Sequence, residues 1–353
     1  MKKSKIILIG LFAIMAVVLS ACAMGPRAVG TPGMTADGDV VYVSYQQYVY
    51  AINAQNGTEI WRYPADGNAQ IVFYAPPEVT EDSVYVGDLS NKFYKLNKEN
   101  GLEQWTFSDA KGWFMGKANE GEGVIYAPSS DRGLYAVSSA NGSLNWKFET
   151  GHQIWAQPVL IKNGILQGSM DQSVYGLSLS GAQLWQMELN GAIVAAPVYD
   201  EVSGKVYIPT IGKSIFALDA STGKVIWQFD TDSSLWSSPL LVDDQLVFSD
   251  EIGNIYLLDA ERGKLVWKIE SGGQVMGGLV EIEGGFVVVT EDSYVRSFDF
   301  ERNPLWTRTV SGELYSTPVN ANGIVVVAAI KGDNLLYGFD MMGNQVWAFK
   351  PGK

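Results

Sequence analysis

The sequence predicts an all-β fold, an eight-bladed β-propeller of four-stranded antiparallel blades, and three observations support this prediction. Tryptophan recurs at intervals of 39 to 44 residues. A glycine stands four residues before seven of these tryptophans, and a Tyr or Phe opens the hairpin in most copies. A period near 40 residues with several short strands per copy is typical of propeller blades. The repeated tryptophans are Trp61, Trp105, Trp146, Trp185, Trp227, Trp267, Trp306 and Trp347.

The clearest copy of the repeat covers residues 215–229. Its first half has apolar side chains on both faces and is predicted to be a strand. Gly223 can supply the positive φ of a short hairpin turn. A second strand is expected over residues 224–229, with Val225, Trp227 and Phe229 on one face. Because neighbouring blades cover both faces of a blade, the repeated tryptophan is interpreted as a packing residue.

Each copy is expected to supply four strands, the first of them near a proline. The first copy starts with its first strand and the last copy ends with its fourth, which favours a ring closed by packing blade eight on blade one. If the copies were offset by one strand at the N-terminus, one blade would instead combine strands from the two ends of the chain. The propeller is predicted to cover residues 31–353. The repeat prolines are Pro32, Pro77, Pro158, Pro197, Pro239 and Pro318, with Ala118 and Leu279 in copies three and seven.

The N-terminus has the features of a lipoprotein signal peptide over residues 1–21. Lysines at its start precede an apolar run over residues 6–19, which is too short for an ordinary membrane-spanning helix. Residues 19–22 read Leu-Ser-Ala-Cys and resemble a bacterial lipobox, so Cys22 is the expected site of lipid attachment, palmitate included. Residues 22–30 would then form a short tether. The alternative is an ordinary secretory signal peptide, with no lipid attached to Cys22.

Lipid attachment predicts the location of the chain. Acyl chains on Cys22 would anchor the protein to a membrane of the cell envelope. In a cell with two membranes this is the periplasmic face of the outer membrane, because Ala23 after the cysteine is compatible with sorting to that membrane. In a cell with one membrane it is the outer face of the cytoplasmic membrane.

Composition excludes several classes of function. Lys plus Arg number 25 and Asp plus Glu 38, a formal net charge of −13, whereas nucleic-acid binding needs a basic face. The single cysteine excludes an internal disulfide, and the single histidine, His152, leaves few routes to a catalytic triad or a metal site. Asp-rich segments such as residues 230–232 lack the spacing of a calcium loop. The sequence therefore predicts neither a metal site nor an enzyme.

The pattern Tyr-Ala-Leu-Asp-x-x-x-Gly-x-x-x-Trp, seen most fully at residues 216–227 and 256–267, resembles the repeat of quinoprotein (PQQ)-like propellers. With the lipobox and eight copies, the chain resembles the BamB-type lipoproteins of outer-membrane β-barrel protein assembly. This resemblance implies a non-catalytic scaffold that mediates protein–protein interactions with envelope proteins, including a β-barrel assembly complex. Quinoprotein dehydrogenases are longer, and many carry an adjacent cysteine pair that this chain lacks, so PQQ is not expected as a cofactor.

A set of residues three positions before the repeat proline is not explained by packing between blades. The first strand of a propeller blade is innermost, so the loop before it enters at one mouth of the central channel. One hypothesis is that these side chains form an aromatic collar that binds an extended peptide or a small apolar ligand. The alternative is that they plug the channel as core. The candidate residues are Tyr74, Trp155, Trp236, Met276 and Tyr315, together with Trp113 from the run Trp113-Phe114-Met115 that precedes Ala118.

Two further functions stay open beside the scaffold. An envelope sensor or ligand-binding lipoprotein that uses the channel mouth is the second hypothesis. A PQQ-dependent dehydrogenase is the third. Adding PQQ and recording the visible absorption band separates the third hypothesis from the other two.

Overall fold

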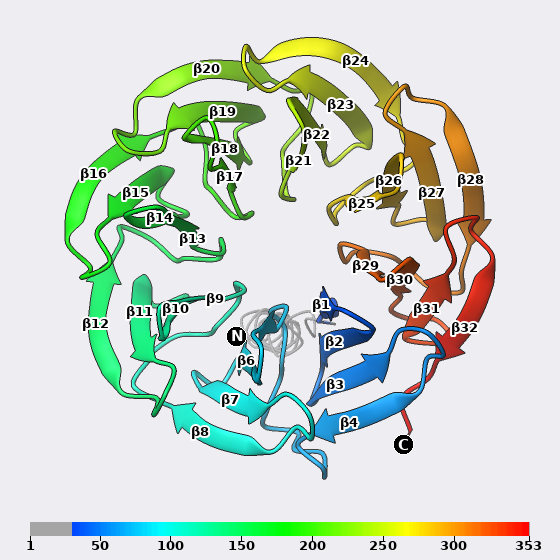
Figure 1. Cartoon of the computed structure of the whole chain (residues 1–353), viewed down its shortest axis with the longest axis horizontal. Coiled ribbons are helices and arrows are strands. Elements are labelled where there is room, and N and C mark those ends of the chain that lie inside the picture. The colour runs from blue at the N-terminus through cyan, green and yellow to red at the C-terminus, as the bar shows by residue number, and fades with distance from the viewer. Residues whose placement is uncertain (1–29, 353) are drawn as a thin grey trace, which may run out of the picture. The chain divides into compact units, whose positions relative to one another are not determined.

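Eight antiparallel sheets are arranged around a central axis in the computed structural model, which describes residues 30–352 (Figure 1). Each sheet has four strands in sequence order, with the first strand nearest the axis and the fourth at the periphery (Figure 1). The strands belong to one compact unit, Thr31–Lys353. The predicted all-β, eight-bladed propeller is confirmed.

The strands of the eight blades have the following bounds. Blade 1 contains β1 (Gly33–Asp37), β2 (Val40–Tyr45), β3 (Tyr48–Asn53) and β4 (Glu59–Tyr63). Blade 2 contains β5 (Glu78–Val79), β6 (Ser83–Gly87), β7 (Phe93–Asn97) and β8 (Glu103–Phe107). Blade 3 contains β9 (Asn119–Gly121), β10 (Val124–Pro128), β11 (Gly133–Ser138) and β12 (Leu144–Glu149). Blade 4 contains β13 (Val159–Ile161), β14 (Gly164–Gly168), β15 (Ser173–Leu177) and β16 (Gln183–Glu188).

The second half of the ring repeats this order. Blade 5 contains β17 (Val198–Asp200), β18 (Lys205–Thr210), β19 (Ser214–Asp219) and β20 (Val225–Asp230). Blade 6 contains β21 (Leu240–Val242), β22 (Gln245–Ser249), β23 (Asn254–Asp259) and β24 (Lys264–Glu270). Blade 7 contains β25 (Val280–Ile282), β26 (Gly285–Val289), β27 (Tyr294–Asp299) and β28 (Pro304–Thr309). Blade 8 contains β29 (Val319–Ala321), β30 (Ile324–Ala328), β31 (Leu336–Phe339) and β32 (Gln345–Phe349).

The predicted signal peptide and Cys22 lie outside the described residues, as does the predicted tether apart from Gly30. Over residues 30–352, no helix is long and apolar enough to cross a bilayer.

Burial follows the position of each strand in its blade. The two middle strands are buried on both faces because adjacent blades cover them; β14 and β26, for example, are buried along their whole length. The outermost strand is covered on one face only, so β20 alternates between exposed and half-buried residues. A β-bulge shifts the register of β19 and β20 between Ala217 and Leu218. Our prediction that Val225 shares a face with Trp227 and Phe229 is therefore wrong. The bulge turns Val225 outward, and its side chain is 43% exposed.

The repeated tryptophans join neighbouring blades. The indole N–H of seven of them donates a hydrogen bond to a backbone carbonyl in the next blade, while the ring packs on the turn glycine of that blade. A Cβ built on Gly101, for example, would lie 2.6 Å from Trp61 Cε3. In blade 7 the turn position is occupied by Arg302, which adopts the same left-handed conformation. The bonded pairs are Trp61 and Lys98, Trp105 and Ser139, Trp146 and Leu179, Trp227 and Ala260, Trp267 and Phe300, Trp306 and Met341, and Trp347 and Ala54.

The ring closes by packing blade 8 against blade 1, with no strand shared between the two sheets (Figure 1). Residues of both blades form one buried apolar cluster. Trp347 Nε1 donates to the carbonyl of Ala54 at 2.6 Å, and the rings of Tyr50 and Phe349 meet edge to face at 5.8 Å. The first copy begins with its first strand and the last copy ends with its fourth, and the closure that this order favoured is the one that forms.

Buried tyrosines predict alkaline unfolding. Burial raises the pKa of Tyr42, Tyr50 and Tyr207 to about 12, against about 10 in an unfolded chain. The folded state thus holds these protons more tightly, and their contribution to stability is complete below pH 10 and is lost as the pH rises from about 10 to 12. Phenolate absorbance and sheet circular dichroism should change together in that range. Titration of these tyrosines near pH 10 with the sheet signal intact would contradict the prediction.

Candidate functional site

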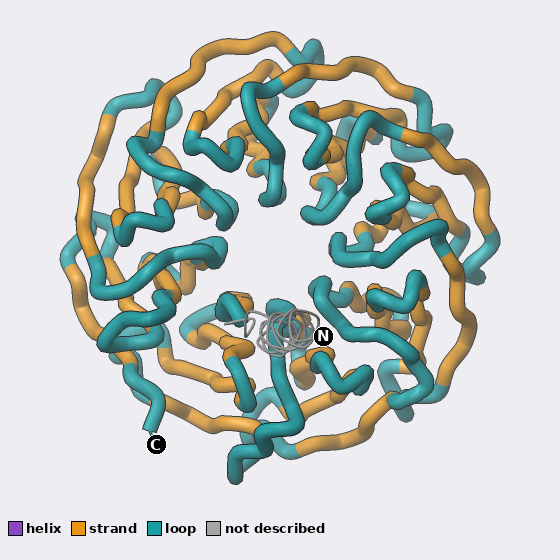
Figure 2. The backbone as a smooth tube through the Cα atoms, turned by 180° about the vertical axis from the view of Figure 1, so that it is seen from behind, coloured by secondary structure: helices purple, strands orange, loops and turns teal. Residues whose placement is uncertain are grey.

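The loops that connect successive blades carry the residues that line the channel. Each loop leaves a peripheral strand, runs inward and begins the innermost strand of the next blade (Figure 2). Its last residues alternate between the core and the channel, as extended backbone requires. The core positions of this alternation are buried and apolar: Phe73, Phe114, Ile154, Ile193, Leu235, Val275 and Leu314.

The residue after each core position faces the channel, and with Thr31 these residues form a ring that we call the channel collar. The channel collar consists of Thr31, Tyr74, Met115, Trp155, Val194, Trp236, Met276 and Tyr315, which line a cavity of about 260 Å³. Every member is half-buried. The structure thus brings together five of the six predicted site residues around open space. Ligand binding at the collar stays a prediction.

Trp113 is the predicted site residue that does not line the channel. Its side chain is 53% exposed. Ser130 of the neighbouring loop holds its backbone on both sides: Trp113 N donates to Ser130 Oγ at 2.7 Å, and Trp113 O accepts from Ser130 N at 2.8 Å. Phe114 then turns into the core, where it is fully buried, and Met115 takes the collar position. Alignment of Phe114 with the buried residues of the other loops is the signal that identifies Met115.

Thr31 is a collar member that sequence reasoning missed. In blade 1 the hairpin closes with Asp37 opposite Val40, and in blade 4 the matching pair is Ile161 and Gly164. Counting back from these pairs aligns Thr31 with Trp155. Our choice of Pro32 as the repeat proline of copy one is therefore wrong, and Met34 aligns with Pro158.

The indole N–H groups give the channel collar polar positions. Trp155 Nε1 donates to Gln153 Oε1 at 3.2 Å. Trp236 Nε1 is buried and, within the described chain, makes no hydrogen bond. A buried donor without an acceptor costs about 1–3 kcal/mol, so a water or a ligand oxygen that reached Trp236 would recover this energy.

Carboxylates surround the collar at blade 8. Tyr315 Oη donates to Glu291 Oε1 at 2.7 Å and lies 3.0 Å from Glu313 Oε2. The hydrogen bond to Glu291 and partial burial raise the pKa of Tyr315. Lys331 lies 2.8 Å from Glu313 and lowers the pKa of that carboxyl. This part of the collar thus has a neutral phenol held by acidic groups.

Below the collar the channel becomes polar. A second cavity of about 320 Å³ shares most of the collar and reaches Thr35, Lys117, Gln157 and Ser238. The wall is held by hydrogen bonds between blades: Thr35 Oγ1 donates to Pro77 O at 2.6 Å, and Gln157 Nε2 donates to Ala118 O at 3.2 Å. The channel therefore offers an apolar mouth next to a more polar interior, an arrangement suited to an apolar group with a polar end.

The collar can be tested by truncating two of its indoles. We expect Trp155→Ala with Trp236→Ala to change the melting temperature by less than about 3 °C, because both side chains are half-buried and face open space. Binding of an extended apolar peptide at the channel should be lost. A much larger fall in melting temperature would show that the two indoles act as a core plug. Trp113→Ala is the matched control and should leave both properties unchanged.

Within residues 30–352, no group of three or more His, Cys, Asp or Glu residues is arranged to hold a metal ion. His152 is exposed and, with Asp131 and Arg132, lines a shallow surface depression that has no lining residue in common with the channel collar.

Residues 18–153, 170–272 and 251–352 match the family described as outer membrane protein assembly factor BamB. The chain belongs to the BamB family. The match covers most of the chain, and the PQQ-like repeat and the resemblance to BamB-type propellers are confirmed.

Curated relatives include members of this family and enzymes. BamB of Shewanella oneidensis is 22% identical over 281 residues, which is 63% of this chain and 69% of that protein. Tetrathionate hydrolase of Acidithiobacillus ferrooxidans is 28% identical over 207 residues, 58% of this chain and 36% of the enzyme. Polyvinylalcohol dehydrogenase of a Sphingopyxis species is 26% identical over 233 residues, which is 56% of this chain and 32% of that enzyme. The chain thus spans about a third of the length of these two enzymes.

A solved structure has the same fold. BamB from Moraxella catarrhalis superposes with a TM-score of 0.73 at 16% identity, covering 85% of this chain and 91% of that one. At this identity the likeness concerns the propeller alone.

Proposed function

We propose that this chain is a lipid-anchored scaffold of the bacterial cell envelope that takes part in the assembly of outer-membrane β-barrel proteins. The family match over most of the chain is the observation that supports this proposal most strongly. Lipid at Cys22 would hold the propeller at the periplasmic face of the outer membrane. The partner would be a component of the β-barrel assembly complex.

The role we propose is non-catalytic. A scaffold needs loops held in fixed positions by a rigid body, and the fully buried middle strands of the blades supply that body. The channel collar presents aromatic, aliphatic and hydroxyl side chains around a cavity, which suit the binding of an extended apolar segment. The enzymes that resemble this chain align over about a third of their own length, so their chemistry is not carried over.

Co-isolation from native membranes tests the scaffold. After mild cross-linking, the tagged full-length protein should co-purify with subunits of a β-barrel assembly complex. Cys22→Ser should release the protein from the membrane and reduce that recovery. Recovery of the anchored protein with no assembly subunit at any cross-linker concentration would contradict the proposal.

A ligand-binding lipoprotein is the second candidate, and the half-buried collar around a cavity is the observation that favours it. Mass spectrometry of small molecules extracted from the purified protein distinguishes this candidate: retention of a ligand that Trp155→Ala with Trp236→Ala abolishes would support it. After addition of PQQ, the mixture should show no visible absorption band beyond that of free PQQ, since we propose no quinone-dependent reaction.

A further inference from the structure

One of the repeated indoles departs from the pattern of the other seven. Five of those seven donate to the carbonyl of the residue directly after the third strand of the next blade, and Trp146 and Trp306 donate to the residue after that. By this pattern Trp185 should donate to the carbonyl of Ala220 or Ser221. Within the described chain, Trp185 Nε1 makes no hydrogen bond, to Ala220 or to any other residue. The seam between blades 4 and 5 therefore leaves one indole donor open.

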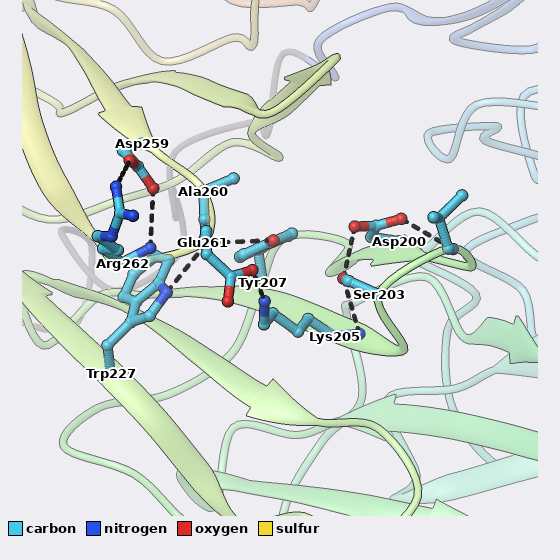
Figure 3. Close-up of polar contacts among 10 residues, drawn as sticks. Asp200, Ser203, Lys205, Tyr207, Trp227, Asp259, Ala260, Glu261 and Arg262 are labelled. Atoms are coloured by element: carbon cyan, nitrogen blue, oxygen red, sulfur yellow. Dashed lines mark hydrogen bonds and ion pairs between the residues drawn. The ribbon is translucent and has the colours of Figure 1, made fainter.

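The seam between blades 5 and 6 shows how the pattern is normally completed (Figure 3). There Trp227 Nε1 and Tyr207 Oη both donate to the carbonyl of Ala260, at 3.0 and 3.2 Å. An ion pair between Lys205 and Glu261 crosses the same seam (Figure 3). Two hydrogen bonds and an ion pair thus join these two blades.

A smaller residue stands beside Trp185. In blades 1, 2, 3 and 5 a tyrosine of the second strand packs on the tryptophan of its own blade, for example Tyr207 on Trp227 at 5.8 Å. Leu166 takes this position in blade 4, since it pairs with Val159 as Tyr207 pairs with Val198. Blades 6 to 8 have valine there and keep their indole bonds, so the open donor is particular to the seam of Trp185.

This seam contains a pocket. A cavity of about 350 Å³ lies between blades 4 and 5, within the size range of sites for small molecules. Its apolar wall is formed by Ile161, Leu177, Leu184 and Tyr199, and Trp185 forms part of the same lining. The lining also includes the turn after β13 and the turn after β19, so the pocket opens at the end of the blades opposite the channel collar.

The charges around the pocket select against an ionised ligand. Lys162 and Asp219 both line it, and their opposite charges leave it without a net charge. Asp219 Oδ1 already accepts hydrogen bonds from the backbone and hydroxyl groups of Ser221 and Thr222, at 2.7 to 3.0 Å. Burying an unpaired charge is costly, so a neutral molecule with one oxygen acceptor fits these surroundings best.

We propose that the seam between blades 4 and 5 is a binding site for a small neutral molecule with an aromatic or branched apolar body and one carbonyl oxygen. The body packs against Leu177, Leu184 and Tyr199, and the carbonyl accepts the hydrogen bond of Trp185 Nε1. The site is independent of the scaffold role and of the channel collar, which lies at the other end of the blades.

A titration followed through the indole N–H resonances tests the site. The full-length protein is labelled at its tryptophans, and 4-phenyl-2-butanone is added; butylbenzene, which lacks the oxygen, is the matched control probe. We expect a saturable shift of the Trp185 resonance, with the ketone binding about three- to tenfold more tightly than the hydrocarbon. No saturable shift, or shifts confined to Trp155 and Trp236 of the collar, would overturn the proposal.

Two variant pairs complete the experiment. Trp185→Phe should reduce the affinity for the ketone to that for butylbenzene, and it should lower the melting temperature less than Trp146→Phe, which also removes the bond to Leu179. Leu184→Lys should abolish binding, whereas Ile226→Lys, the equivalent exposed position of blade 5 outside the pocket, should not. Equal affinity of wild type and Trp185→Phe for the ketone would overturn the role of the indole.

Discussion

Trp347→Ala is expected to lower the free energy of unfolding by about 3–5 kcal/mol, the usual cost of removing a buried tryptophan. The side chain is 8% exposed, donates to Ala54 O at 2.6 Å and packs on Gly57. The seam it occupies is the one that closes the ring without a shared strand, so its loss weakens the contact that holds the first and last blades together. Urea unfolding at constant m-value measures the change.

A tryptophan from the middle of the ring provides the control. Trp146 is only half-buried, and the chain on both sides of its seam is continuous. We expect Trp146→Ala to cost about half as much as Trp347→Ala. Equal losses for the two variants would contradict the special role of the closing seam, and a loss below about 1 kcal/mol for Trp347→Ala would contradict the role of the indoles in packing.

Gly101→Ala is the second change with a large expected effect, a loss of about 2–4 kcal/mol. Gly101 has a φ of 71°, which costs an alanine about 1 kcal/mol. In addition, the new Cβ would lie 2.6 Å from the ring of Trp61, which is buried between blades 1 and 2. Relief of that overlap moves the indole, and overpacking of this kind costs about 1–3 kcal/mol more.

Gly204→Ala separates the two contributions. Gly204 has a φ of 70°, nearly that of Gly101, and a Cβ there would meet nothing within 4 Å. Only the backbone cost of about 1 kcal/mol should therefore remain. Chemical denaturation of both variants measures the difference. If the two variants lose the same stability, the glycine is required by its backbone conformation alone and the tryptophan contact contributes nothing.

The fold was predictable because one physical requirement recurs in every copy. Each hairpin exposes an indole that only a following copy can bury, and the glycine four residues before Trp227 or Trp267 supplies both the turn and the room for the preceding indole. The order of strands in the first and last copies also favoured the closure that forms. The bulge that exposes Val225 was not predictable, since it depends on how β19 and β20 pair and not on the alternation within either strand.

Five of the eight residues of the channel collar were among the site residues predicted from the sequence. The alternation before the repeat proline placed Tyr74, Trp155 and Tyr315 correctly. It failed at Trp113, where three consecutive apolar residues give no register until Phe114 is known to enter the core. The open donor of Trp185 could not be foreseen, because Leu166 is an apolar residue much like the valines at the same position of blades 6 to 8, and those blades keep their indole bonds.

The protein content of the outer membrane in the native organism, with and without this chain, tests the proposed function most directly. Quantitative proteomics of outer-membrane fractions should show a fall in β-barrel proteins when the chain is deleted. Re-expression of the wild-type chain should restore these proteins, whereas Cys22→Ser should not. Unchanged levels and folding of the β-barrel proteins in the deletion strain would contradict the proposal that this propeller assists their assembly.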